Sequence, residues 1–177
     1  MKRILTATDG SHHALKALTF AADLAKKYDA ELLIVHVVID GKLSDQDRHL
    51  LETEYATEIG DRIRQLHTQT AEDVNVEFLP QALLLRHDEA ATIIRDFFGE
   101  RLLSSAEESA REIGASKVNT TMAHGDPAKM ILAIAEESHV DLIALGSRGS
   151  GEWRALLLGS VSSKVAHMAH CSVTLVR

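Results

Sequence analysis

Within about the first forty residues, a short apolar run is followed by a segment with helical periodicity and then by a second apolar run. RILTATD (3–9) is rich in β-formers and ends in the turn residues Asp9-Gly10-Ser11, which predicts a buried strand. Apolar residues recur at helical spacing through HALKALTFAADLAKKY, and AELLIVHVV (30–38) follows as a nearly continuous apolar strand. This order predicts a βαβ unit, and therefore a parallel sheet with right-handed crossovers.

The C-terminal part of the chain repeats this order of elements. Three segments have the pattern of strands: KVNTTMA (117–123), VDLIALG (140–146) and CSVTLVR (171–177). Helical patterns lie between them, in HGDPAKMILAIAEES with its proline near the first turn, and in residues 156–169. Five strands that alternate with helices predict a three-layer α/β fold.

The middle of the chain departs from this rhythm. Residues 44–72 predict a mostly solvated helix with one apolar face, and residues 81–113 predict a second helical tract with Gly99 as a candidate break. A single crossover helix needs only about a dozen residues, so this region exceeds the minimal fold. Four apolar residues of the second tract form either ordinary core or a surface that covers a partner subunit: Ile93, Ile94, Phe97 and Phe98.

Composition and charge narrow the class of protein. The formal net charge is −7 and no dense Lys/Arg tract is present, which argues against binding to nucleic acid. Cys171 is the only cysteine, so we exclude an intrachain disulfide and expect a packed apolar residue there. His36 is expected to be a hydrogen-bonded core residue, and the ten histidines show no metal-ligand spacing, so we expect no metal site. No signal segment or membrane-spanning run is apparent, so we expect a cytoplasmic protein.

Four glycines and five serines lie in GSRGSGEWRALLLGSVSS (146–163). A glycine costs a helix or strand roughly 0.5–1 kcal/mol relative to alanine, so the cluster indicates either simple turns or a close approach to the backbone. Gly146 ends a predicted strand, and Gly159 stands at the start of the last predicted helix. Open α/β sheets bind ligands at the carboxyl ends of their strands, and helix N-termini attract phosphates. The stretch therefore predicts a phosphate site, although both common phosphate-loop motifs are missing.

The spacing of these residues carries a family resemblance. The pattern G-x2-G-x9-G-S resembles the nucleotide signature of the universal stress protein family, in its ATP-binding branch. Other segments are similar to that family's strands and helices, in the same order, over residues 2–40 and about 100–177: ILTATDGS, LLIVHVV, HGDPAKMILAIAEE, LIALGSRG and LLLGSVSSKVAHMAHCSVTLVR.

The resemblance implies a Rossmann-like fold of the adenine nucleotide alpha-hydrolase type. Its open five-stranded parallel sheet would have the order 3-2-1-4-5, with helices on both faces. Residues 1–177 would form one domain of the universal stress type, with a helical insertion after the second strand within residues 41–99. The strand order reverses between strands 1 and 4, so Asp9 and Gly146 would face one cleft.

The same resemblance assigns site residues by position. Asp9 and the backbone of Val37 match the positions that hold the adenine end, and Ala7 matches a position near the sugar where many members have proline or another small residue. Asp9 could instead cap the first helix, a role that Ser11 can also fill. Two loops match those around the ribose and phosphates: Gly146, Arg148 and Gly149 in the first, and Gly159, Ser160, Val161 and Ser162 in the second. Arg148 lies at a position that varies in the family; from its chemistry it can supply a cation, and Ser160 and Ser162 can supply hydroxyl donors.

The resemblance implies an ATP-binding regulatory protein of the stress response, with Mg²⁺ carried by the ATP phosphates. It would act as a homodimer through the last strand, Cys171 to Arg177, and the insertion would offer a site to a protein partner. No paired carboxylates or general base lie near the glycine loops, so slow ATP hydrolysis stays open but efficient catalysis is not expected. The alternative is a nucleotide-hydrolysing or nucleotidyl-transferring enzyme on a related fold, whose SGG-x-DS or H-x-G-H signatures are missing. ADP, AMP and a cyclic adenine nucleotide stay open as ligands beside ATP.

Overall fold

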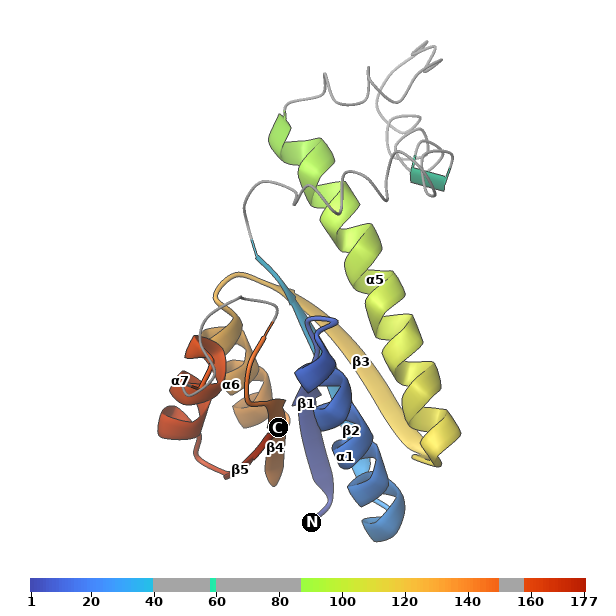
Figure 1. The fold of residues 1–177 in the computed structure, drawn as a ribbon, viewed down its shortest axis with the longest axis vertical. Helices are drawn as coiled ribbons and strands as arrows, with labels where there is room; N and C mark the ends of the chain where they lie inside the picture. Colours follow the sequence, from blue (N-terminus) through green and yellow to red (C-terminus); the bar gives the residue numbers. More distant parts are fainter. Residues whose placement is uncertain (40–57, 60–86, 150–157) are drawn as a thin grey trace. The chain divides into compact units, whose positions relative to one another are not determined.

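A computed structural model describes residues 1–39, 58–59, 87–149 and 158–177 (Figure 1). The chain divides into two compact units, one formed by Met1–Ile39 with Gly99–Arg177 and the other by Asp40–Phe98. The helices and strands of the described residues are, in chain order, β1 (Arg3–Ala7), α1 (His12–Tyr28), β2 (Glu31–Val38), α5 (His87–Ile113), β3 (Lys117–His124), α6 (Pro127–Glu137), β4 (Leu142–Gly146), α7 (Ser160–Met168) and β5 (Ser172–Val176). The five predicted strands are confirmed.

The five strands form one sheet in the order β3-β2-β1-β4-β5, and every pairing is parallel. This is the expected order 3-2-1-4-5. The register pairs Ala7 of β1 with Val35 of β2, and Thr6 of β1 with Ala144 of β4. The strand order reverses between β1 and β4, because β2 and β3 lie on one side of β1 while β4 and β5 lie on the other.

Helices cover both faces of the sheet, as expected (Figure 1). Alternate residues of a strand point to opposite faces, so Ile4 packs in the core shared with α1 and α5, and Leu5 packs in the core shared with α6 and α7. The helix α1 approaches the sheet mainly through small side chains, which are buried: Ala14, Ala17, Ala21, Ala22 and Ala25, beside Leu18. Both faces of β1 and β4 are therefore buried, as their continuous apolar runs predicted.

Two of the helices are capped at their N-termini by a side chain. Ser11 caps α1 by accepting a hydrogen bond from the Ala14 N–H at 3.3 Å, so Ser11 fills the capping role that was also open to Asp9. Asp126 caps α6 by accepting from the Lys129 N–H at 2.9 Å, and this bond lowers the pKa of the Asp126 carboxyl. Pro127 follows at the first position of α6, where its missing N–H costs nothing.

The helix α5 runs unbroken from His87 to Ile113, so the break considered at Gly99 is wrong. One glycine inside a helix costs only about 1 kcal/mol relative to alanine. Burial of Leu103, Ala106 and Ala110 against the sheet offsets that cost. The glycine also leaves room for its neighbours, because a Cβ at this position would lie 2.8 Å from the Met122 Sδ and 2.9 Å from the His36 Cδ2, and one of these side chains would have to shift.

Most of the predicted insertion lies outside the described residues. Within the range 44–72 only Glu58 and Ile59 are described, and both are helical. In the second predicted tract, Ile94 and Phe97 are buried, as core residues are, while Ile93 and Phe98 are half-buried. The rings of Phe97 and Phe98 meet edge to face, with centroids 5.7 Å apart.

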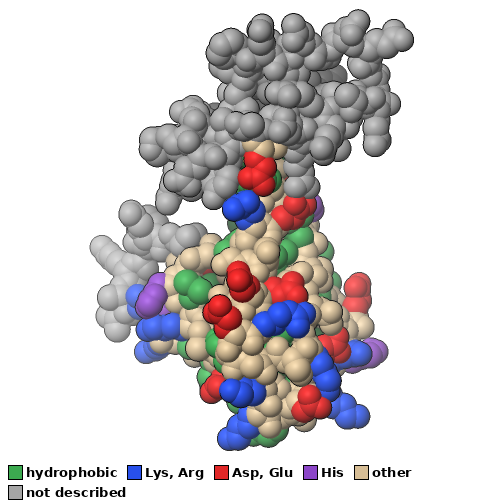
Figure 2. Space-filling view, turned by 90° about the vertical axis from the view of Figure 1, so that its right-hand side faces the viewer, with side chains coloured by type: hydrophobic (Ala, Val, Ile, Leu, Met, Phe, Trp, Pro, Cys, Tyr) green, Lys and Arg blue, Asp and Glu red, His purple; other side chains and the backbone are tan. Residues whose placement is uncertain are grey.

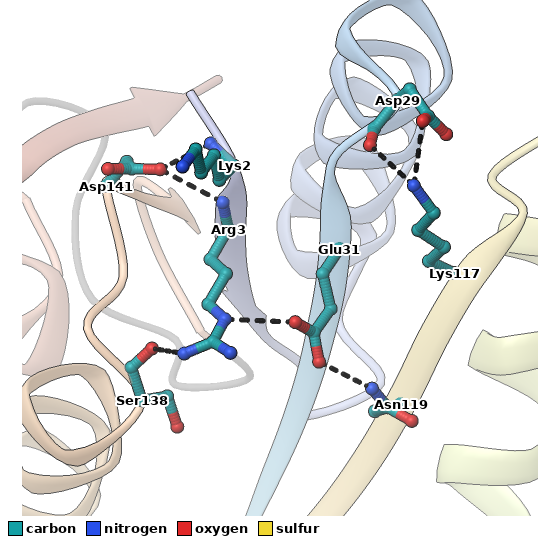
Figure 3. Close-up of polar contacts among 8 residues, drawn as sticks. All are labelled: Lys2, Arg3, Asp29, Glu31, Lys117, Asn119, Ser138 and Asp141. Atoms are coloured by element: carbon teal, nitrogen blue, oxygen red, sulfur yellow. Dashed lines mark hydrogen bonds and ion pairs between the residues drawn. The ribbon is translucent and has the colours of Figure 1, made fainter.

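A polar network joins the elements at the amino-terminal edge of the sheet (Figure 3). The Asp141 carboxylate accepts hydrogen bonds from the backbone N–H groups of Lys2 and Arg3, at the start of β1. The Arg3 guanidinium donates to the Glu31 carboxylate at 3.0 Å and to the Ser138 carbonyl at 2.7 Å.

Charged side chains of both signs are interspersed over the face drawn in Figure 2. None of the described helices is long and apolar enough to cross a membrane.

Replacing Asp141 with asparagine is expected to lower the melting temperature at neutral pH. The two backbone hydrogen bonds lower the pKa of this carboxyl in the folded protein. A lowered folded-state pKa contributes stability above the unfolded-state pKa, and this contribution is lost as the pH falls through the folded-state pKa. The difference between wild type and variant should therefore narrow in thermal melts recorded from about pH 7 down to about pH 3.

The exposed Asp23 of α1 offers a matched control, because it allows the same substitution at a carboxyl away from this network. Asp23→Asn should leave the melting temperature nearly unchanged across the same range. If the melting temperature of Asp141→Asn stays below that of the wild type by the same amount at every pH, the shape of the side chain, rather than its charge, stabilises the amino-terminal edge of the sheet.

Candidate functional site

The candidate site lies at the carboxyl ends of β1 and β4, on either side of the point where the strand order reverses. The first of its residues, Asp9, follows β1 and is exposed. Its Oδ1 accepts a hydrogen bond from the Ser11 N–H at 3.0 Å, which turns the carboxylate toward the start of α1. A carboxylate held in this way at the open edge of a sheet is placed to accept hydrogen bonds from a ligand.

The structure brings Asp9 and Gly149 together. A Cβ added at Gly149 would lie 2.6 Å from the Asp9 Oδ2, well inside the contact distance. Because any side chain at position 149 would push the carboxylate away, the glycine allows the loop after β4 to pass directly over Asp9. The loops after β1 and β4 therefore meet at this pair of residues.

Gly146, the last residue of β4, is buried and lies close to α1. A Cβ there would be 2.6 Å from the His13 carbonyl carbon and 2.9 Å from the Ala14 nitrogen, both of which are backbone atoms. The Gly146 carbonyl accepts a hydrogen bond from the Ser162 hydroxyl at 2.7 Å. The first turn of α7 is thereby attached to the end of β4, and the Ser162 proton is directed inward.

Ser147 joins the two glycine loops, although no pattern in the sequence singles it out. This residue is buried; its N–H donates to the Val176 carbonyl at 2.7 Å, and its carbonyl accepts from the Gly159 N–H at 2.8 Å. A Cβ at Gly159 would lie 3.3 Å from the Cα of Arg148. Residues 146–149 and residue 159 therefore form one continuous backbone surface. The only feature of the sequence that pointed to Ser147 was its place between Gly146 and Arg148.

The helix α7 begins at this surface. Gly159 is its N-cap and contributes no capping side chain. Ser160 is exposed, whereas Val161 is half-buried and packs against the core shared with α6 and α7. The N-terminal turn of a helix carries partial positive charge and N–H groups that bind anions.

The remaining predicted residues occupy strand ends around this surface. Ala7 and Val37 are half-buried and pack against the core shared with α6 and α7. Val37 lies two residues beyond Val35, the register partner of Ala7, so it is level with Asp9 along the sheet. Arg148 is half-buried between the two glycines of the first loop.

Two further expectations concern residues away from this surface. Cys171 is half-buried and packs against the core shared with α6 and α7, as expected of a small apolar residue. Burial raises the pKa of its thiol above the ordinary value, so the thiol is protonated at neutral pH. Among the residues that the structure describes, no three His, Cys, Asp or Glu side chains form a group that could hold a metal ion.

The topology and the site together define an open α/β protein with a glycine-rich surface at its topological switch point. The chain belongs to the universal stress protein family, whose model matches residues 1–177. A curated relative agrees: Universal stress protein YxiE from Bacillus subtilis is 33% identical over 175 residues, which cover 99% of this chain and 98% of that protein.

Solved structures of universal stress proteins share the fold. UspA from Lactobacillus plantarum superimposes with a TM-score of 0.66 at 21% identity, over 99% of this chain and 97% of that one. A universal stress protein in complex with cAMP gives a TM-score of 0.60 at 19% identity, over 99% and 96% of the two chains. A universal stress protein from Archaeoglobus fulgidus in complex with dAMP gives 0.58 at 18% identity, over 100% and 98%.

Proposed function

We propose that this universal stress protein binds ATP at the carboxyl ends of β1 and β4 and acts as a regulatory protein in the cytoplasm. The observation that carries the proposal is the junction of the two glycine loops, where the Gly159 N–H donates to the Ser147 carbonyl at 2.8 Å. This junction places the start of α7 beside the loop that passes over Asp9. The cAMP and dAMP complexes of proteins with this fold support an adenine nucleotide as the ligand class.

The adenosine end is assigned to the ends of β1 and β2. Asp9 offers carboxylate oxygens that accept hydrogen bonds from hydroxyl or amino groups. The Val37 backbone can pair with the edge of the base, and Ala7 leaves room beside the sugar because it carries only a methyl group. Two of these residues are half-buried and Asp9 is exposed, which suits a ligand that enters from the open edge of the sheet.

The phosphates are assigned to the glycine surface and the first turn of α7. The N–H groups of Ser160 and Val161 lie in the helix turn that favours anions, and the exposed Ser160 hydroxyl can add a donor. Arg148 supplies a cation from the first loop. The Ser162 hydroxyl donates a hydrogen bond to the Gly146 carbonyl, so its part is to hold the two loops together, while its oxygen can still accept a hydrogen bond. Mg²⁺ would arrive with the ATP phosphates.

Assembly is assigned to the edge strand β5. Its residues Val173, Thr174, Leu175 and Val176 are half-buried, whereas every residue of β4 beside it is buried. In the described sheet β5 pairs only with β4, so its outer edge offers backbone N–H and C=O groups to a second copy of the chain. We propose a homodimer through Cys171 to Arg177, with residues 41–99 available to a protein partner.

The proposal is tested by calorimetric titration of the nucleotide-stripped protein with ATP and Mg²⁺, and then with ADP, AMP and cAMP. The expected result is saturable binding of ATP at one site per chain, with weaker binding of AMP because it makes fewer phosphate contacts. Sedimentation of the same samples should show a dimer. A folded protein that binds none of these nucleotides would refute the proposed ligand, and a monomer at all concentrations would refute the β5 interface.

A further inference from the structure

His36 of β2 makes a hydrogen bond that connects it to the candidate site. Its Nδ1 lies 2.9 Å from the carbonyl oxygen of Thr8, the residue that precedes Asp9. A carbonyl oxygen can only accept, so the ring must donate, and Nδ1 carries a proton in this contact. His36 is half-buried and hydrogen-bonded, which agrees with the expectation of a hydrogen-bonded core residue.

The peptide groups around Thr8 are held from several directions. The Thr8 N–H donates to the Val35 carbonyl at 2.9 Å, and its hydroxyl oxygen accepts from the Gly10 N–H at 3.3 Å. The bond from His36 fixes the Thr8 carbonyl, which belongs to the same peptide unit as the Asp9 nitrogen. Thr8 is itself buried, so the strand end that carries Asp9 is held in one orientation.

The ring of His36 is in turn held by packing. A Cβ on Gly99 of α5 would lie 2.9 Å from the His36 Cδ2, 3.3 Å from its Nε2 and 2.8 Å from the Met122 Sδ. The imidazole therefore fills the space that a side chain at position 99 would need. This contact explains why a helix-disfavouring residue lies inside an unbroken helix.

We infer that His36 is a positioning residue for the adenosine end of the nucleotide, an inference that rests on the proposed function. It acts through the Thr8 carbonyl, which sets the direction in which the Asp9 carboxylate leaves β1 toward Gly149. His36 touches no nucleotide atom in this assignment. Gly99 contributes to this positioning, because it leaves room for the His36 ring.

The inference is tested with the full chain and AMP as the probe, which isolates the adenosine end with a single phosphate. His36→Leu removes the donor and should weaken AMP binding about tenfold, or roughly 1.4 kcal/mol. His36→Asn should recover most of the affinity, because an asparagine amide nitrogen occupies nearly the position of Nδ1 and can donate to the same carbonyl. Gly99→Ala should weaken AMP binding in the same direction by displacing the ring. His167→Leu, on an exposed position of α7, is the matched control and should leave AMP binding unchanged.

A double-mutant cycle separates positioning from a merely structural role. If His36 acts through Asp9, then His36→Leu has no further effect on AMP binding in an Asp9→Asn background. An equal loss in both backgrounds would overturn the inference, as would unchanged AMP binding by His36→Leu.

A measurement on the nucleotide-free protein distinguishes this inference from the proposed function. The backbone amide resonances of Asp9 and Gly10 should move in His36→Leu and return toward wild type in His36→Asn. Amides that do not move would refute the positioning role whatever the ligand is. If these shifts are seen in His36→Leu but the wild-type protein binds neither AMP nor ATP, the ligand assignment is refuted and only the hydrogen bond from His36 to Thr8 is left.

Discussion

Replacing Gly159 with glutamate is expected to reduce the affinity for ATP and Mg²⁺ at least about 100-fold, or roughly 3 kcal/mol, while the protein stays folded. The substitution places a carboxylate at the start of α7, where the phosphates are assigned and where like charges repel. A Cβ at this position would lie 3.3 Å from the Arg148 Cα and 3.6 Å from the Ser162 Oγ, which is tight but not a severe overlap. The loss is measured by calorimetry, and circular dichroism checks the fold.

Ala166→Glu is the matched control for this experiment. It adds the same charge to an exposed position of α7, nearly two turns beyond Gly159. Because the charge lies away from the N-terminal turn, its effect on ATP affinity should be within about threefold. If Gly159→Glu and Ala166→Glu weakened ATP binding equally, general repulsion would explain the loss and the phosphate assignment would fail.

Replacing Gly146 with alanine is expected to lower the free energy of unfolding by about 3 kcal/mol, the upper end of the usual cost of overpacking. The added Cβ would lie 2.6 Å from the His13 carbonyl carbon and 2.8 Å from the His13 oxygen. Those atoms belong to the first turn of α1, whose backbone cannot move without disturbing the buried contacts of that helix against the sheet. Denaturation by urea measures the change.

Gly159→Ala is the matched control for stability, because it is the same substitution in the same glycine surface. The atom nearest to the added Cβ, the Arg148 Cα, would be 3.3 Å away, so a shift of the Arg148 loop by a few tenths of an ångström relieves the contact. We expect a change in the free energy of unfolding below about 1 kcal/mol. If Gly146→Ala were as stable as Gly159→Ala, the close approach of β4 to α1 would be wrong.

The glycines of the candidate site were indicated by local patterns in the sequence, and the resemblance to the family assigned the other site residues by position. Gly146 ends an apolar run and Gly159 lies near the start of a helical period, so both could be placed near strand and helix ends without knowledge of the fold. The strand order came from the resemblance to the family, and the observed pairing of β1 with both β2 and β4 confirms it. The position of Asp9 followed from the end of the first apolar run.

The sequence could not show which residues hold that site in place. Ser147 and His36 act through backbone partners far away in the chain: Ser147 through Val176 and Gly159, and His36 through Thr8, 28 residues earlier. A serine between two glycines and a histidine inside a strand carry no local pattern that names such partners. These bonds depend on the parallel pairing of strands that the chain brings together only after crossovers.

Gly99 shows most clearly the difference between what a local sequence pattern predicts and what the tertiary structure decides. By itself a glycine inside a helical pattern predicts a possible end of the helix, and the sequence offers nothing against that interpretation. In the structure the helix continues, and Gly99 leaves the space beside it to the side chains of His36 and Met122. The sequence by itself determined the order of strands and helices and indicated the glycines of the candidate site, since hydrophobic periodicity and turn chemistry are local. Only the tertiary structure decided which glycine ends an element and which one makes room for a neighbour, since that depends on side chains from other elements.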